Sequence, residues 1–375
     1  MNSAQKIIDV LCEQALHPAR TIAESCKATG KEAVGCFPIY TPEELVYAAG
    51  FLPVGMWGGS TEIKLADRYL QGFCCSIMRA NIEYGMRGVY NRLKAVLLPT
   101  LCDTLKCICE NWKVAVPQVP VIPVVYPQNR GIAAGEQYLR DEFSRVRREL
   151  EEIGGRPVRD EALEEAFALY EDWRGAMREF CEAAASHPKT INARVRHLVI
   201  KAAWFTDKKD YTGKIRELTE ALKHMPEESC SVRVVATGLT AEPVGVLDLL
   251  VENDVAIVAD DLAQESRQFR TPARPDGDAL SKMVWRIVDQ RGCPFLYEKE
   301  KTRGQMLIDQ VEKYHADAVV TLLMKFCDPD EFDYPIYKAE LEEAKIPHLY
   351  LEVEQQMDSF GQIGTRIQSF AEMLG

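Results

Sequence analysis

The sequence lacks the features of a membrane-spanning or exported protein. No uninterrupted apolar run in its 375 residues approaches the roughly 18–20 residues that a membrane helix needs. Segment 1–20 has the pattern of an amphipathic helix, without the basic start, apolar centre and small-residue cleavage site of a signal peptide. We therefore expect a cytoplasmic protein with no membrane partner.

Several short motifs are also missing, and each absence removes a class of function. No G-x-G-x-x-G or G-x-x-x-x-G-K-[ST] pattern is present, so neither a dinucleotide site nor an ATP site is indicated. The six histidines form no pair at the spacing of a metal site or a catalytic triad. The formal net charge is −12, and binding to a phosphate backbone needs a basic surface, so nucleic acid is not expected as a partner.

Cysteine, by contrast, is abundant, with twelve residues. In a cytoplasmic protein of this size, cysteines stay reduced, bind metal or take part in chemistry more often than they form disulfides. No Cys-x-x-Cys pair exists, which disfavours zinc ribbons and thioredoxin-like motifs. Cys102, Cys107 and Cys109 miss the plant-ferredoxin spacing C-x4-C-x2-C by one residue, so local spacing does not identify a cluster site.

Two stretches of the chain follow the same order of strands and helices. Apolar runs predict four strands in the first stretch, at 31–40, 52–59, 94–103 and 119–127. Corresponding runs predict four strands in the second, at 232–239, 255–261, 317–328 and 346–355. Continuous apolar strands that alternate with helices are typical of parallel sheets covered on both faces. We predict an α/β protein with two doubly wound, Rossmann-like parallel-sheet domains related by internal duplication.

Helical segments surround these two predicted domains. We expect an N-terminal helical segment at 1–30, a first α/β domain at 31–130, a helical linker or insertion at 131–225 and a second α/β domain at 226–375. Within the first domain, Thr41 is expected to cap the next helix, with Pro42 in its first position.

Cysteines recur at equivalent places in the two halves. In open parallel sheets, ligands collect beyond the carboxyl ends of the strands, and Cys102 and Cys327 each lie there in a Cys-Asp pair. Cys75 is expected at a helix N-terminus on the same side, where the helix dipole should lower the pKa of its thiol. Three thiolates from two halves would meet in one cleft, and a cluster on three thiolates keeps one iron open.

Packing is the competing explanation, because free cysteine is among the most buried residue types. For Cys102 and Cys327 the two explanations are about equally good on these grounds. Five cysteines are interpreted as packing residues: Cys12, Cys26, Cys181, Cys230 and Cys293. Four near the expected cleft stay open: Cys36, Cys74, Cys107 and Cys109.

Polar residues after two other strands are candidates for substrate binding. Arg267 lies in the segment 265–270 that follows a predicted strand, where its guanidinium could bind phosphate or carboxylate. A solvated basic loop explains it equally well. Glu354 and Gln355 end the last predicted strand at the same edge, which favours a polar site role.

Six segments together carry a resemblance to a known family: 35–59, 73–78, 101–105, 259–270, 324–329 and 365–370. Through them the chain resembles, over nearly its full length, the 2-hydroxyacyl-CoA dehydratase family, which includes subunits of the benzoyl-CoA reductase type. It is most similar to the smaller, β-type subunits, and looks nearest to those of 2-hydroxyisocaproyl-CoA dehydratase, with the 2-hydroxyglutaryl-CoA, phenyllactoyl-CoA and lactoyl-CoA enzymes as close competitors.

The resemblance implies an oxygen-sensitive enzyme used in anaerobic amino-acid fermentation. It implies a heterodimer with a homologous α subunit, and a [4Fe-4S] cluster on Cys75, Cys102 and Cys327. The choice of Cys75 over Cys74 depends on the register of Cys-Ser-Ile-Met. A separate ATP-dependent iron–sulfur activator protein would supply one electron. The resemblance leaves open whether the protein also binds a flavin.

The implied reaction removes water from an (R)-2-hydroxyacyl-CoA to give an (E)-2-enoyl-CoA. One electron on the thioester carbonyl gives a ketyl radical, which expels the α-hydroxide and acidifies the β-proton. Two alternatives remain. One is a non-catalytic electron-transfer or benzoyl-CoA-reductase-type subunit on the same fold, and the other is a reduced, cysteine-rich binding protein without metal. The acyl chain depends on pocket shape and is not fixed by the sequence.

Overall fold

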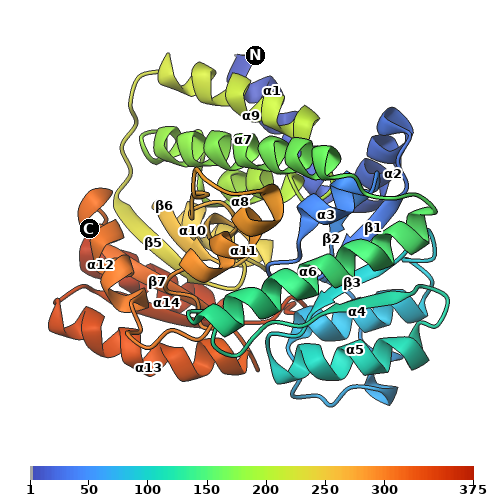
Figure 1. Cartoon of the computed structure of the whole chain (residues 1–375). Coiled ribbons are helices and arrows are strands. Elements are labelled where there is room, and N and C mark those ends of the chain that lie inside the picture. Colours follow the sequence, from blue (N-terminus) through green and yellow to red (C-terminus); the bar gives the residue numbers. More distant parts are fainter. Residues whose placement is uncertain (1–2) are drawn as a thin grey trace.

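The computed structural model describes residues 3–375 and contains two four-stranded sheets (Figure 1). The first sheet has the order β2-β1-β3-β4, formed by β1 (Ala33–Cys36), β2 (Leu52–Gly55), β3 (Val96–Pro99) and β4 (Val121–Val124). The second has the order β6-β5-β7-β8, formed by β5 (Val232–Gly238), β6 (Val255–Leu262), β7 (Ala318–Met324) and β8 (His348–Val353). All neighbouring strands are parallel. The identical order confirms the prediction of two duplicated, doubly wound sheets.

The strands are apolar because both faces of each sheet are covered. Every residue of β3, β6 and β7 is buried, whereas β8, at the edge of its sheet, alternates between buried and more exposed residues. Strand β5 ends at Gly238, which has φ +145°, and a Cβ there would lie 2.2 Å from the carbonyl oxygen of Leu322. Glycine therefore permits the close approach of β5 to β7 at the end of the sheet that faces the candidate site.

Helices follow the strands in both halves. The first half contains α3 (Glu43–Ala48), α4 (Ser76–Met86) and α5 (Asp103–Ala115). The second contains α10 (Val244–Glu252), α11 (Ala279–Asp289), α12 (Arg303–Lys313), α13 (Asp328–Glu343) and α14 (Gly361–Leu374). The predicted cap of α3 is wrong: Pro42 occupies the N-cap position, and the Thr41 hydroxyl donates instead to the carbonyl of Phe37 at 2.6 Å.

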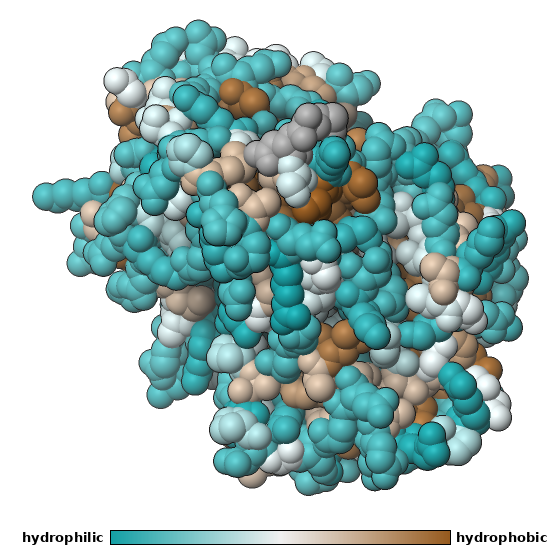
Figure 2. All heavy atoms as spheres, turned by 90° about the horizontal axis from the view of Figure 1, so that it is seen from above, coloured by the Kyte–Doolittle hydropathy of each residue, from teal (hydrophilic) through white to brown (hydrophobic). Residues whose placement is uncertain are grey.

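A helical layer lies over the two sheets. It is formed by α1 (Ser3–Leu16), α2 (Pro18–Thr29), α6 (Ala133–Gly154), α7 (Asp160–Ala185), α8 (Ala193–Ala202) and α9 (Lys208–Lys223). Helices α1, α7, α8 and α9 share a hydrophobic core of their own. The outer face that carries α1 and α9 is mainly hydrophilic (Figure 2). None of the helices described is long and apolar enough to span a bilayer.

The largest hydrophobic core is continuous across the two halves. It includes Val34 and Leu97 from the first sheet and Val234 and Val320 from the second. Because the same core reaches both sheets, the ends of their strands are held at a fixed seam. Side chains from the two halves can therefore form one site there.

Candidate functional site

Cys75, Cys102 and Cys327 line one cavity at the seam between the halves. Each occupies the N-cap position of a helix: Cys75 before α4, Cys102 before α5 and Cys327 before α13. Cys102 lies three residues beyond the end of β3, and Cys327 lies three residues beyond the end of β7. These strands hold the same position in their respective sheets. The structure therefore brings together the three cysteines that the sequence singles out.

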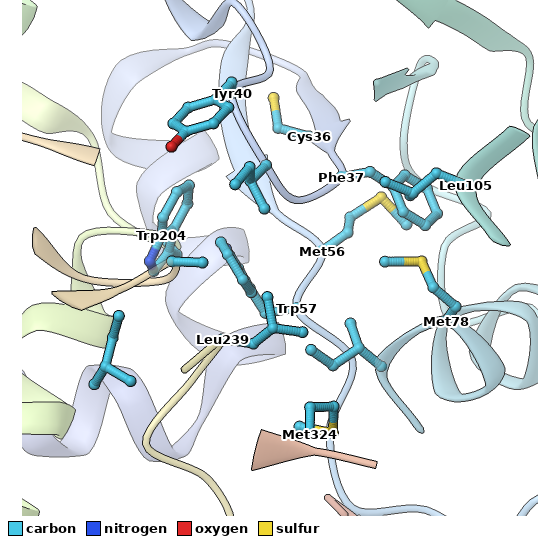
Figure 3. Close-up of a cluster of buried hydrophobic side chains, with 14 of the residues drawn as sticks. Cys36, Phe37, Tyr40, Met56, Trp57, Met78, Leu105, Trp204, Leu239 and Met324 are labelled. Atoms are coloured by element: carbon cyan, nitrogen blue, oxygen red, sulfur yellow. The ribbon is translucent and has the colours of Figure 1, made fainter. Parts of the chain in front are cut away.

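The rest of the cavity wall is mainly apolar. The cavity has about 450 Å³ of empty space, including the part that opens to solvent. Trp57 and Leu239, which follow β2 and β5, lie close to each other on one side (Figure 3). The lining contains no lysine, arginine or histidine, and its other members are Pro38, Ile39, Ile77, Met78, Thr104, Leu105, Phe295, Phe326, Asp328 and Pro329. The lining offers three thiols to a ligand, with no basic side chain to neutralise their thiolates.

Burial, more than the helix dipoles, sets the acidity of these thiols. It raises the pKa of Cys75 to about 12, that of Cys102 to about 11, and that of Cys327 well above the usual range. N–H groups at the helix starts act in the opposite direction, as where Leu105 donates to Cys102 Sγ at 3.5 Å, but they are weaker. The expectation that the helix start lowers the pKa of Cys75 is therefore wrong, because loss of hydration outweighs the dipole.

The three thiols do not form a site for a single metal ion. Among residues 3–375, no three or more His, Cys, Asp or Glu side chains are grouped so that they could hold one metal ion. In a cluster of several irons, each thiolate binds a different iron, so the sulfur atoms stand farther apart than around one ion. Iron cations would also supply the positive charge that the lining lacks, and metal binding deprotonates thiols that are otherwise neutral.

Comparisons with known proteins identify the family of the chain. The sequence profile described as "2-hydroxyglutaryl-CoA dehydratase, D-component" matches residues 38–374. The chain belongs to this dehydratase family.

Three relatives of the dehydratase family span nearly the whole chain. Lactoyl-CoA dehydratase subunit beta of Anaerotignum propionicum is 42% identical over 377 residues, covering all of both chains. (R)-phenyllactyl-CoA dehydratase beta subunit of Clostridium sporogenes is 38% identical over 375 residues, again covering all of both. (R)-2-hydroxyglutaryl-CoA dehydratase subunit beta of Acidaminococcus fermentans is 38% identical over 363 residues, 95% of this chain and 96% of its own. The chain is thus a β-type subunit of the family, and its relatives are parts of multi-subunit hydro-lyases.

The raised pKa values make a prediction about thiol reactivity in this dehydratase-family chain. Alkylation requires the thiolate, and a pKa of about 11 leaves about one Cys102 in a thousand ionised at pH 8. In the chain prepared without metal, iodoacetamide at pH 8 should label the exposed Cys107 well before Cys75 or Cys102. The rate at Cys102 should then rise about tenfold per pH unit up to pH 10. Peptide mass spectrometry measures each rate, and equal labelling of Cys102 and Cys107 at pH 8 would contradict this explanation.

The other cysteines of the dehydratase-family chain lie outside the cavity lining. Cys36, Cys74 and Cys109 are buried, but none of them is part of the cavity wall. Cys107 is exposed. The five cysteines predicted to be packing residues each belong to or contact a hydrophobic cluster: Cys12, Cys26, Cys181, Cys230 and Cys293. The four open cases are therefore separated from the three that line the cavity.

The predicted substrate-binding residues are not part of the wall either. Arg267 is fully buried, and its guanidinium bonds both carboxylate oxygens of Asp261, at 2.9 and 2.8 Å. In this structure its guanidinium neutralises a buried carboxylate, and its role in substrate binding stays a prediction. Gln355 is 2% exposed and bonds within the chain, and its role in substrate binding likewise stays a prediction. Glu354 is half-buried outside the lining, and its role stays a prediction.

Some wall residues were not singled out from the sequence. Trp57, Leu239 and Phe326 each lie within three residues of the carboxyl end of a strand, the region where parallel sheets place their ligands. Their position after a strand was the one feature in the sequence that could have identified them as site residues. Their apolar side chains, however, resemble those of ordinary core residues. Asp328 was visible only as the partner of Cys327 in the repeated Cys-Asp pair.

Proposed function

We propose that the chain is the β subunit of an ATP-activated (R)-2-hydroxyacyl-CoA dehydratase and that Cys75, Cys102 and Cys327 hold one [4Fe-4S] cluster. The observation that carries the proposal is the meeting of these three thiols, from both halves, in one cavity. Full-length similarity to β subunits named for three different 2-hydroxyacyl-CoA dehydratases supports the reaction class.

The residues present fit the proposed cluster. Three thiols are available on a wall without basic side chains, and three helix N-termini point their positive ends toward the same space. No fourth cysteine is found among the described lining residues, so three thiolates would leave one iron without a protein sulfur. Thr104 and Asp328 are the lining residues with side-chain oxygen atoms.

When bound, a cluster of this kind supplies one-electron transfer and a Lewis-acidic iron at its open position. The chain's own side chains set the surroundings of that chemistry. Trp57, Met78 and Leu105 exclude water from the part of the cavity next to the three cysteine sulfur atoms. A wall of low polarity also strengthens the electrostatic effect of the three helix N-termini. The wall also limits the access of solvent, and of the dioxygen dissolved in it, to the thiolates.

The proposal includes two protein partners. A homologous α subunit would complete the heterodimer, and an ATP-dependent iron–sulfur activator would deliver the electron that starts the reaction. The product would be an (E)-2-enoyl-CoA, formed through a ketyl radical of the thioester.

An anaerobic reconstitution tests the proposed reaction. The chain, a homologous α subunit and a candidate activator would be purified without oxygen and mixed with a series of (R)-2-hydroxyacyl-CoA thioesters. We expect enoyl-CoA to form only when ATP and all three proteins are present, and the chain alone to be inactive. Reduction of an aromatic thioester with no dehydration of any 2-hydroxyacyl-CoA would instead assign the complex to the benzoyl-CoA reductase type.

A further inference from the structure

Gln355 is a buried connection between the two halves beside the cysteine cavity. Its Oε1 accepts the N–H of Gly59 at 2.9 Å, and its Nε2 donates to the carbonyl of Trp57 at 2.8 Å and to the carboxylate of Glu242. Its backbone N–H donates to Ser76 Oγ at 3.1 Å. Every polar atom of its side chain is thus used, and the side chain itself does not line the cavity.

The partners of Gln355 are the segments that carry the cavity wall. Trp57 is a wall residue, and Ser76 is the first residue of α4, directly after Cys75. Ser76 Oγ also lies 2.9 Å from the sulfur of Met324, the last residue of β7, three residues before Cys327. Two contacts therefore tie the Cys75 segment of the first half to the strands of the second.

We propose that Gln355 is a positioning residue for the cluster site: its side chain ties the wall segment 57–59 of the first half to Glu242 of the second, beside the start of α4 and Cys75, which its backbone N–H holds through Ser76. This inference rests on the proposed function, because it gives Gln355 a task at that same site. A ligand whose orientation is fixed by hydrogen bonds outside the coordination sphere binds its metal more tightly.

The charge on Glu242 fixes which way the amide of Gln355 points. Burial would raise the pKa of the Glu242 carboxyl, but Lys201 and His197 outweigh it and hold that pKa well below the usual range. An ionised carboxylate only accepts hydrogen bonds, so the Nε2 of Gln355 must face it. The carbonyl oxygen of the amide is then left for the N–H of Gly59. A glutamate at 355 would lack the donor, and an asparagine would be too short to reach both segments.

Gln356 provides a matched control on the same loop. Its Nε2 donates to the carbonyl of Gly59 at 3.1 Å, yet no bond links it to Ser76 or Glu242. Loss of the Gln356 side chain therefore removes a contact to the same segment without breaking the link between Trp57 and Glu242 that the Gln355 side chain makes.

The test compares Gln355→Ala and Gln356→Ala in the anaerobically purified complex. Iron release to a chelator, the electron paramagnetic resonance spectrum of the reduced protein and its midpoint potential would be measured. We expect Gln355→Ala to release iron about tenfold faster with a changed spectrum, because lost outer contacts cost metal sites about 10–100-fold in affinity. The rate of iron release from Gln356→Ala should stay within about twofold of that from the wild type.

Glu242→Gln gives a second, nearly isosteric variant. A neutral amide at 242 no longer dictates the orientation of Gln355, so we expect a smaller change in the same direction. If Gln355→Ala does not fold, Glu242→Gln decides the question in the same way. Release rates and spectra equal to those of Gln356→Ala would overturn the positioning role while the cluster remains. A wild-type complex without iron would overturn the proposed function itself, so the two failures are distinguishable.

Discussion

Replacing Cys75 by alanine is expected to remove most of the iron from the chain, whereas the same change at the adjacent Cys74 leaves it in place. Both side chains are buried, but only Cys75 lines the cavity that it shares with Cys102 and Cys327. With one of three thiolates gone, iron in the anaerobically purified chain should fall from about four per chain to below about one.

The comparison separates ligand loss from a general effect of removing a buried thiol. Dehydration in the reconstituted complex should fall at least about 100-fold for Cys75→Ala, and Cys107→Ala, at an exposed site, serves as a second control. Iron analysis and activity are read on the same preparations. Iron loss in Cys74→Ala with full iron in Cys75→Ala would assign the ligand to Cys74, and retention in both would reject the assignment of this segment.

Asp261→Asn should destabilise the fold by about 3–5 kcal/mol. Asp261 lies at the end of β6, is 2% exposed, and bonds Arg267 and Arg303 at 2.8–2.9 Å as well as Arg270. The three arginines hold the pKa of its carboxyl far below the usual range, so it is ionised at neutral pH. A neutral amide would leave the buried guanidinium of Arg267 without its counter-charge, whereas Arg303 keeps Asp330 and Asp333.

Asp289→Asn is the matched surface control. The carboxylate of Asp289 accepts hydrogen bonds from Nε and Nη2 of Arg274, at 2.8 and 2.7 Å, but the side chains of Asp289 and Arg274 are 34% and 44% exposed. Removing an exposed pair should cost only about 0–1 kcal/mol. Urea unfolding of the purified protein, followed by circular dichroism, measures both. Similar losses in the two variants would show that the Asp261 network does not stabilise the fold as its burial implies.

The strand pattern could be predicted because each strand is nearly all apolar. Every predicted strand range coincides with a strand of the structure, with β6 running one residue beyond the range 255–261. The Cys-Asp pairs that follow β3 and β7 fall at one edge because strands of a parallel sheet end together. That regularity sufficed to bring Cys102 and Cys327 to one place.

The acidity of the thiols could not be predicted in the same way. The helix start at Cys75 was visible in the sequence, but the loss of hydration depends on which side chains pack over the sulfur. Those side chains come from loops after several strands, among them Trp57 and Leu239, whose meeting is a property of the tertiary fold.

Buried polar residues were the hardest to interpret. Arg267 and Gln355 follow strands at the site edge, which favours ligand binding on sequence grounds, yet both are bonded within the chain. The partners of Gln355 in the first half lie 279 and 298 residues away in sequence. No local pattern carries such pairings, so the difference between a ligand-binding and a positioning side chain emerges only from the fold.

Diffraction at the iron absorption edge tests the central claim most directly. Crystals of the complex grown without oxygen should show, in this subunit, one anomalous iron peak bonded to the sulfur atoms of Cys75, Cys102 and Cys327 and to no other protein sulfur. An empty cavity in iron-containing crystals, or an iron peak bonded to Cys107 or Cys109, would contradict it.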